Sequence, residues 1–160
     1  VMEGSRPVLT EVQALVTKSG FPSPRRMCTG FDYNRMCIIL AVLEKRAGLF
    51  FGTLDVYVNI VGGLRLEEPA ADLPVALALY SGLMDRPIND KLTAMGEIGL
   101  GGEIRAVGQV AKRLKEVERM GFEKCIIPKQ ALRGLDLADY SIEVIPVSNV
   151  KQAFDAINKG

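Results

Sequence analysis

Two hydrophobic periods alternate along this chain, and their alternation restricts the possible folds more than any other feature. Between Thr53 and Val61 an apolar residue occupies every second position, as in a half-buried strand, and Gly62-Gly63 then ends the pattern. From Met36 to Arg46 the apolar residues instead recur at helical spacing, up to a stop near Gly48. A chain that uses both periods must pack helices against a sheet, because each element has an apolar face to bury.

The remaining segments continue this mixture. Further strands are predicted at Pro7–Thr17, Cys125–Ile127 and Ile142–Ile145, and further helices at Asp72–Met84, Val110–Val117 and Val150–Ile157. Because a helix tolerates Pro74 only in its first turn, we expect the Asp72 carboxylate to cap that helix. Gly101-Gly102 predicts a hairpin with a two-residue turn between Met95 and Val107. We therefore predict an α+β fold, a mixed sheet with packed helices, in a single domain covering residues 1–160.

The composition excludes several functions. With 20 Lys and Arg against 19 Asp and Glu, the net charge of +1 lacks the excess of a strongly basic nucleic-acid binder, so any basic surface must be local. The chain has no histidine, which excludes Ser-His and Cys-His nucleophiles and His-ligated zinc. Cys28, Cys37 and Cys125 form no C-x-x-C pair, which predicts a cytoplasmic location and no metal site in this chain. The longest apolar run, Met36–Leu43, is too short to cross a bilayer.

Four motifs together identify a family resemblance. They are EGSRP at residues 3–7 with the EVQALV strand that follows, AVLEKRAGL at 41–49, DVYVNIVGG at 55–63 and EPAADL at 68–73. In these motifs the chain resembles the C-terminal Lon-protease-like domain of the RadA (Sms) family of bacterial DNA repair proteins. The resemblance implies a fold similar to the Lon proteolytic domain and to domain 2 of ribosomal protein S5.

The resemblance also implies a larger protein around this domain. In that family a zinc-binding segment and a RecA-like ATPase core process DNA strands during recombinational repair, and this chain lacks the G-x-x-x-x-G-K-[ST] phosphate loop of an ATPase. We therefore expect a fragment with no cofactor of its own, and ATP, magnesium and zinc in the parent protein. The expected partners are further copies in a ring, a hexamer by resemblance, single-stranded or branched DNA, and a recombinase, but no membrane.

Comparison with Lon proteases predicts that proteolysis has been lost. Aligning Pro69–Asp72 with the proteases' Pro-Ser-Ala-Gly places Ala70 at the nucleophile, and Gly96-Glu97-Ile98 then matches their Gly-Glu-Ile. The same register puts Arg113 at the catalytic lysine, with Lys112 one position away. Alanine has no hydroxyl and arginine stays protonated, so no catalytic residue of a Ser-Lys dyad remains. We expect position 70 to lie at the rim of a cleft, where a serine could stay hydrated.

Arg25, Arg26 and Arg35 form the densest basic cluster. The first two lie in a proline-bounded loop, and Arg35 opens the next helix. Guanidinium groups placed in this way could contact DNA phosphates, and a ring of subunits would multiply their charge. Surface salt bridges with Asp32 or with a neighbouring subunit are an open alternative. If they bind DNA, these arginines should be nearly dispensable for folding.

A second basic stripe has a simpler interpretation. Lys112, Lys115 and Arg119 lie on one side of the Val110–Val117 helix and its continuation, but Glu116 and Glu118 flank them. This pattern favours a solvated helix face with intrahelical ion pairs.

The predicted function is a non-proteolytic scaffold and DNA-contacting domain of a RadA-type repair and recombination ATPase, supporting ring assembly and the processing of recombination intermediates. Two alternatives remain open. One is an active Lon-type peptidase that pairs a displaced serine with Lys112. The other is a purely protein–protein oligomerisation module, with DNA contacted only by other domains.

Overall fold

The computed structural model describes residues 11–61 and 69–159, and its first sheet is built from strands in the order β1-β3-β2. Strand β1 (Glu11–Lys18) pairs antiparallel with β3 (Leu54–Val61), and β2 (Arg26–Thr29) pairs with β3 in parallel. Residues 7–10 of the first predicted strand and the Gly62-Gly63 stop lie outside the described residues. Strand β2 was not expected, because it is short and shows no clear alternation.

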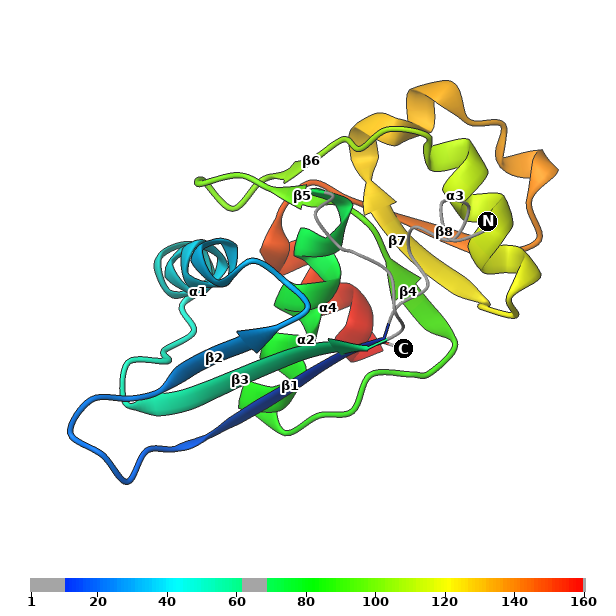
Figure 1. Ribbon diagram of the computed structural model, residues 1–160. Coiled ribbons are helices and arrows are strands. Elements are labelled where there is room, and N and C mark those ends of the chain that lie inside the picture. The colour runs from blue at the N-terminus through cyan, green and yellow to red at the C-terminus, as the bar shows by residue number, and fades with distance from the viewer. Residues whose placement is uncertain (1–10, 62–68, 160) are drawn as a thin grey trace.

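Helices α1 (Tyr33–Ala47) and α2 (Asp72–Met84) cover one face of this sheet (Figure 1). The inward residues of β3, Val56 and Val58, are buried there with the apolar side of α1. Helix α2 approaches β1 closely at Gly82, where a Cβ atom would lie 3.2 Å from Val16 Cγ2. Helix α1 ends at Gly48, which adopts the left-handed conformation (φ 71°) that glycine tolerates best. The stop predicted from the sequence is therefore confirmed.

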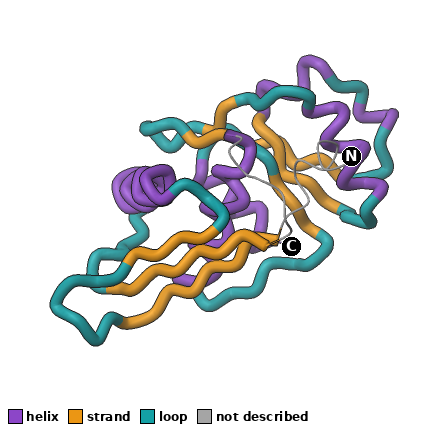
Figure 2. The backbone as a smooth tube through the Cα atoms, in the orientation of Figure 1, coloured by secondary structure: helices purple, strands orange, loops and turns teal. Residues whose placement is uncertain are grey.

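The second sheet is wholly parallel, in the order β4-β7-β8, with β4 at Leu92–Ala94, β7 at Lys124–Pro128 and β8 at Glu143–Val147. Helix α3 (Val110–Arg119) packs against it, and short 3-10 turns at Lys129–Gly134 and Leu137–Asp139 connect β7 to β8. Helix α4 (Val150–Lys159) returns to the first half of the molecule, where Phe154 stacks on Tyr80 of α2 with ring centroids 4.2 Å apart. Figure 2 shows the helices and strands in this arrangement.

A hairpin of β5 (Glu97–Ile98) and β6 (Ile104–Arg105) joins the two halves. The expected two-residue turn is wrong. Gly99 N–H donates to the Glu103 carbonyl at 2.9 Å and Gly102 N–H to the Gly99 carbonyl at 2.9 Å, and of the glycine pair only Gly102 has a positive φ (84°). This is a three-residue loop with a turn followed by a left-handed glycine, the next most common hairpin connection.

The predicted α+β class, with helices packed on sheets, is confirmed, but the strands form three small sheets instead of one mixed sheet. The buried residues correspondingly divide into two hydrophobic clusters, a larger one under the first sheet and a smaller one under α3. None of the helices within residues 11–61 and 69–159 has the length and apolar composition that a bilayer crossing requires.

Candidate functional site

Ala70 lies in a 3-10 turn (Pro69–Ala71) directly before α2. It is only 4% exposed and packs in the smaller cluster with Met95 and Leu114. The Ala70 carbonyl accepts a hydrogen bond from Gly96 N–H at 3.1 Å, and the Gly96 carbonyl accepts one from Leu73 N–H at 3.0 Å. The expectation of a hydrated cleft rim at position 70 is therefore wrong, because the methyl group is part of the core.

Arg113 is also buried, with 8% of its surface exposed. It lies on α3, and its Nε donates to the Gly108 carbonyl at 2.8 Å. Val110 and Leu114, its neighbours on the helix, belong to the same cluster as Ala70. Both positions aligned with the Lon dyad are therefore buried, Ala70 within the smaller cluster and Arg113 on the helix that contributes Val110 and Leu114 to it, and neither side chain can act as nucleophile or base.

Asp72 does not cap α2. The helix begins without a side-chain cap, and the carboxylate, 1% exposed, instead accepts hydrogen bonds from Ile98 N–H at 2.9 Å and from Arg35 Nε at 3.0 Å. A second guanidinium nitrogen of Arg35 completes a bidentate ion pair with Asp72 and also donates to the Ile98 carbonyl at 2.7 Å. The prediction of a helix cap is wrong because a buried carboxylate gains more from a paired guanidinium than from the helix end alone.

This ion pair joins three elements that are distant in the sequence. Arg35 comes from α1, Asp72 from α2 and Ile98 from β5. The hydrogen bonds to Asp72 raise the pKa of the Arg35 guanidinium above its ordinary value, so this guanidinium stays charged. No local sequence pattern announces the contact, since 37 positions separate the two charged residues.

The three arginines predicted to bind DNA have different environments. Arg26, at the start of β2, donates to the Leu54 carbonyl and, at 2.9 Å, to the Phe51 carbonyl, so it holds the turn before β3. Arg35 is engaged with Asp72. Only Arg25 presents its guanidinium at the surface, 4.0 Å above the Phe21 ring, while its backbone N–H donates to Asp55 at 2.7 Å. Their contacts argue against the expectation that Arg26 and Arg35 are dispensable for folding.

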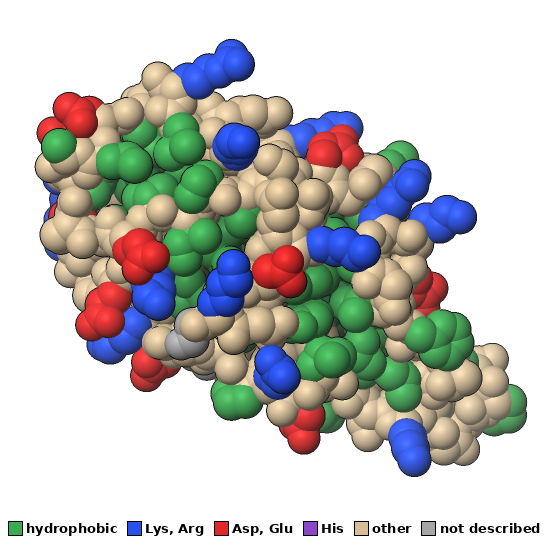
Figure 3. All heavy atoms as spheres, turned by 180° about the vertical axis from the view of Figure 1, so that it is seen from behind, with side chains coloured by type: hydrophobic (Ala, Val, Ile, Leu, Met, Phe, Trp, Pro, Cys, Tyr) green, Lys and Arg blue, Asp and Glu red, His purple; other side chains and the backbone are tan. Residues whose placement is uncertain are grey.

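The basic stripe on α3 pairs as the sequence predicts. Arg119 lies 2.8 Å from Glu116, and Lys115 lies 4.0 Å from Glu118, both at i,i+3 spacing. Lys112 is exposed on the same helix. Figure 3, which shows the molecule from behind, likewise has basic and acidic side chains interspersed on that face.

Neither Cys125 nor Cys28 has the lowered pKa of an activated nucleophile. Burial raises the pKa of the Cys125 thiol to about 12. Burial, together with the negative charge of Asp32, also raises the pKa of the half-buried Cys28 thiol. Both shifts disfavour the thiolate that a catalytic cysteine requires.

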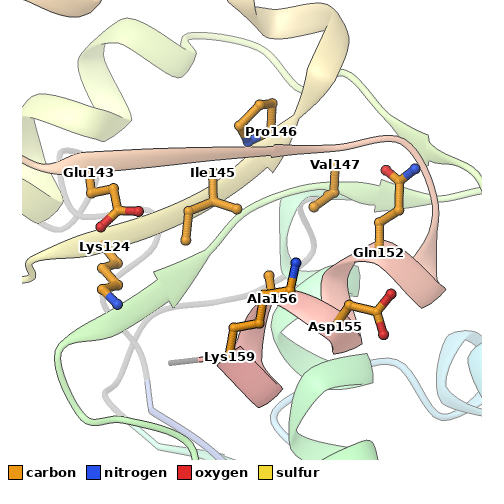
Figure 4. Close-up of a pocket in the computed structure, with 9 residues that line it drawn as sticks. All are labelled: Lys124, Glu143, Ile145, Pro146, Val147, Gln152, Asp155, Ala156 and Lys159. Atoms are coloured by element: carbon orange, nitrogen blue, oxygen red, sulfur yellow. The ribbon is translucent and has the colours of Figure 1, made fainter.

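The described residues contain no cluster of acidic and cysteine side chains suited to a metal ion. A pocket of about 480 Å³ does lie between β8 and α4, lined by Lys124, Glu143, Ile145, Pro146, Val147, Gln152, Asp155, Ala156 and Lys159 (Figure 4). Its two lysines are matched by two carboxylates, so its charge does not favour a phosphate.

Comparisons with known proteins agree with this fold. Residues 36–131 match the family described as "Subunit ChlI of Mg-chelatase". DNA repair protein RadA of Streptococcus pyogenes serotype M1 is 47% identical over 156 residues, which is 98% of this chain and 34% of that protein. The RadA protein of Synechocystis is 49% identical over 148 residues (92% and 29%), and that of Halalkalibacterium halodurans 46% over 154 residues (96% and 34%).

The fold and the match over residues 36–131 define the class, a ChlI-type, Lon-like domain. The chain belongs to the family of RadA DNA repair proteins and represents their Lon-like domain. It spans about a third of the length of the curated relatives it matches.

Proposed function

We propose that this domain is a non-catalytic scaffold that supports ring assembly and contacts DNA in a RadA-type repair and recombination ATPase. One observation carries the proposal. At the place that corresponds to the catalytic centre of Lon proteases, the buried methyl group of Ala70 replaces a hydroxyl, and the nearby Asp72 carboxylate is locked by Arg35.

The chemistry of this centre supports a structural role. Arg113 carries a guanidinium, which is not a general base, and Lys112 is exposed on α3, without the burial that typically activates a catalytic lysine. A Ser-Lys dyad needs a hydroxyl beside a neutral amine. The alternative of an active peptidase predicts a covalent adduct with a serine-directed reagent and turnover of casein, and the scaffold proposal predicts neither.

DNA contact is proposed through Arg25, Arg26 and Arg35, with Arg25 as the main contributor. Its side chain is exposed, and no carboxylate forms an ion pair with it in residues 11–61 and 69–159. In a ring, proposed to be a hexamer, the same arginine would recur in every subunit and follow the DNA backbone. ATP, magnesium and zinc would be bound by other parts of the parent protein, and a recombinase would be its partner in the cytoplasm.

The test is DNA affinity of the ring-forming parent protein at several salt concentrations. Arg25→Ala should weaken binding to every sequence and flatten the slope of log affinity against log salt by about 0.7–0.9, the value of one phosphate contact. The triple variant with Arg26→Ala and Arg35→Ala should flatten it by about two. Lys112→Ala, which removes the same charge from α3, is the matched control and should change neither quantity.

Ring mass and melting temperature must accompany these measurements, because Arg26 and Arg35 also have contacts within the fold. An unchanged slope for Arg25→Ala in an intact ring would refute the phosphate role. If the intact ring's DNA binding does not depend on this domain at all, the oligomerisation module is the correct alternative.

A further inference from the structure

Within residues 11–61 and 69–159, no helix covers the face of the β1-β3-β2 sheet that lies opposite α1 and α2 (Figure 1). Paired residues of adjacent strands project to the same face, so the register gives its composition row by row. Tyr57 stands at the centre, with Leu15 of β1 on one side and Met27 of β2 on the other. Leu15 is 59% exposed and Met27 is 55% exposed, while Tyr57 is half-buried between them.

Polar residues border this apolar row. The next row towards the end of β2 consists of Gln13, Asn59 and Thr29. The row on the other side pairs Thr17 with Asp55. The face therefore has a central apolar and aromatic row between groups that can donate and accept hydrogen bonds, and Val61, 43% exposed, lies beyond one of these polar rows at the end of β3. From these observations, we infer that this face is a stacking platform for single-stranded nucleic acid.

The charges around the face complement a phosphate backbone. The loop between β1 and β2 carries Arg25 and Phe21, whose ring is 50% exposed with the guanidinium 4.0 Å above it. Asp55 is 5% exposed and is engaged by Arg25 N–H. Positive charge thus lies beside the central aromatic row.

A second copy of the chain fits this face less well. Stable protein interfaces have an apolar centre within a patch of about 800 Å² per partner, whereas here the central row is interrupted on both sides by polar rows. Base stacking needs only an exposed aromatic or apolar row with basic groups at its side, and amides and hydroxyls nearby can bind base edges. Single-stranded nucleic acid is therefore the occupant that the composition favours.

This inference rests on the proposed DNA contact and deepens it, because it adds base stacking at Tyr57 to phosphate contact at Arg25. The probe is an oligothymidylate strand, with duplex DNA for comparison, bound to the ring-forming parent protein. Tyr57→Val keeps a good strand former but removes the ring, and it should weaken oligothymidylate binding about 5- to 150-fold, the value of one stacked base. The salt dependence should not change. Tyr57→Phe should keep nearly full affinity.

Tyr140→Val is the matched control, since Tyr140 lies below a lysine, Lys115, at 4.9 Å in the other half of the molecule. Oligothymidylate with a photoreactive halogenated base should crosslink to Tyr57 or Phe21. If Arg25→Ala changes the salt slope but Tyr57→Val leaves affinity unchanged, the platform is refuted and the DNA-contact proposal stands. Absence of salt-dependent binding that involves this domain would refute both. Loss of ring mass in Tyr57→Val would instead assign the face to a subunit contact.

Discussion

The two three-stranded sheets of this domain differ in how much of their surface is buried. The parallel sheet is covered on both sides, and four consecutive residues of β7, from Cys125 to Pro128, are buried. The β1-β3-β2 sheet buries one face against α1 and α2 and leaves Leu15 and Met27 of the other face largely exposed. Antiparallel pairing permits such a one-sided sheet, whereas parallel strands joined by helical crossovers are normally buried on both faces. The first sheet therefore has an open face that a ligand could use.

The largest expected effect concerns the ion pair between Arg35 of α1 and Asp72 of α2. Arg35→Ala should destabilise the domain by about 3–5 kcal/mol, because it leaves the buried Asp72 carboxylate without its guanidinium partner. Urea unfolding followed by circular dichroism measures this. Arg46→Ala, which removes an exposed arginine from the same helix, is the control. It should change the free energy of unfolding by no more than about 0.5 kcal/mol. Equal midpoints for the two variants would show that the pair is not structurally important.

The contrast between the sheets predicts that shortening a side chain destabilises the domain more in β7 than on the open face of the first sheet. Ile127→Ala in β7 should lower the free energy of unfolding by about 2–5 kcal/mol, because the side chain is completely buried and its removal leaves a cavity. Met27→Ala on the open face should change stability by about 0.5 kcal/mol or less. The same unfolding measurement compares them. A large loss of stability in Met27→Ala would mean that this face is covered in solution. The first sheet would then not be open on one side.

Ala70→Ser tests the former nucleophile position. A hydroxyl at this buried site should destabilise the domain by about 1–3 kcal/mol unless it finds a hydrogen-bond partner. Ala106→Ser, at an exposed position, is the control. A melting temperature of Ala70→Ser equal to that of the unsubstituted domain would indicate that the new hydroxyl is hydrated or hydrogen-bonded.

The smallest effect is a pH dependence in the second half. Glu118 accepts hydrogen bonds from Ile142 N–H and Ser141 N–H, and these, with the charge of Lys115, lower its pKa below the ordinary 4.5. A carboxyl whose folded-state pKa is lowered stabilises the protein above the unfolded pKa and loses this contribution as the pH falls through the folded value. Glu118→Gln should therefore flatten the fall of stability below about pH 4.5. If the stability of Glu118→Gln falls with pH as steeply as that of the unsubstituted domain, Glu118 does not cause this pH dependence.

Local patterns in the sequence predicted most elements but not their pairing. The alternation in β3 and the helical spacing in α1 depend on neighbours along the chain, so both could be recognised. Strand β2 has four residues and gains its structure only from pairing with β3, which no local period reveals. The hairpin was predicted, but the turn type depends on which glycine takes the positive φ.

In the candidate site, too, the sequence predicted positions but not the contacts between distant residues. Alignment with the Lon motif selected Ala70 and Arg113, and both are buried in the structure. The partner of Asp72 could not be predicted, because Arg35 reaches it only after two helices and a hairpin have packed together. The hydrogen bonds of the Arg26 side chain were missed for the same reason, since its acceptors are carbonyl groups of a distant turn.

The return of α4 to the first half has a consequence for synthesis on the ribosome. The larger cluster extends from Met36 to Phe154, and the stacking of Phe154 on Tyr80 joins residues 74 positions apart. A nascent chain can form β1, β3 and α2 early, but it cannot close their core until the segment with α4 has left the exit tunnel. Contacts of such high sequence separation slow folding and prolong the exposure of apolar surface. The first half of this domain should therefore depend on chaperones until its last helix is made.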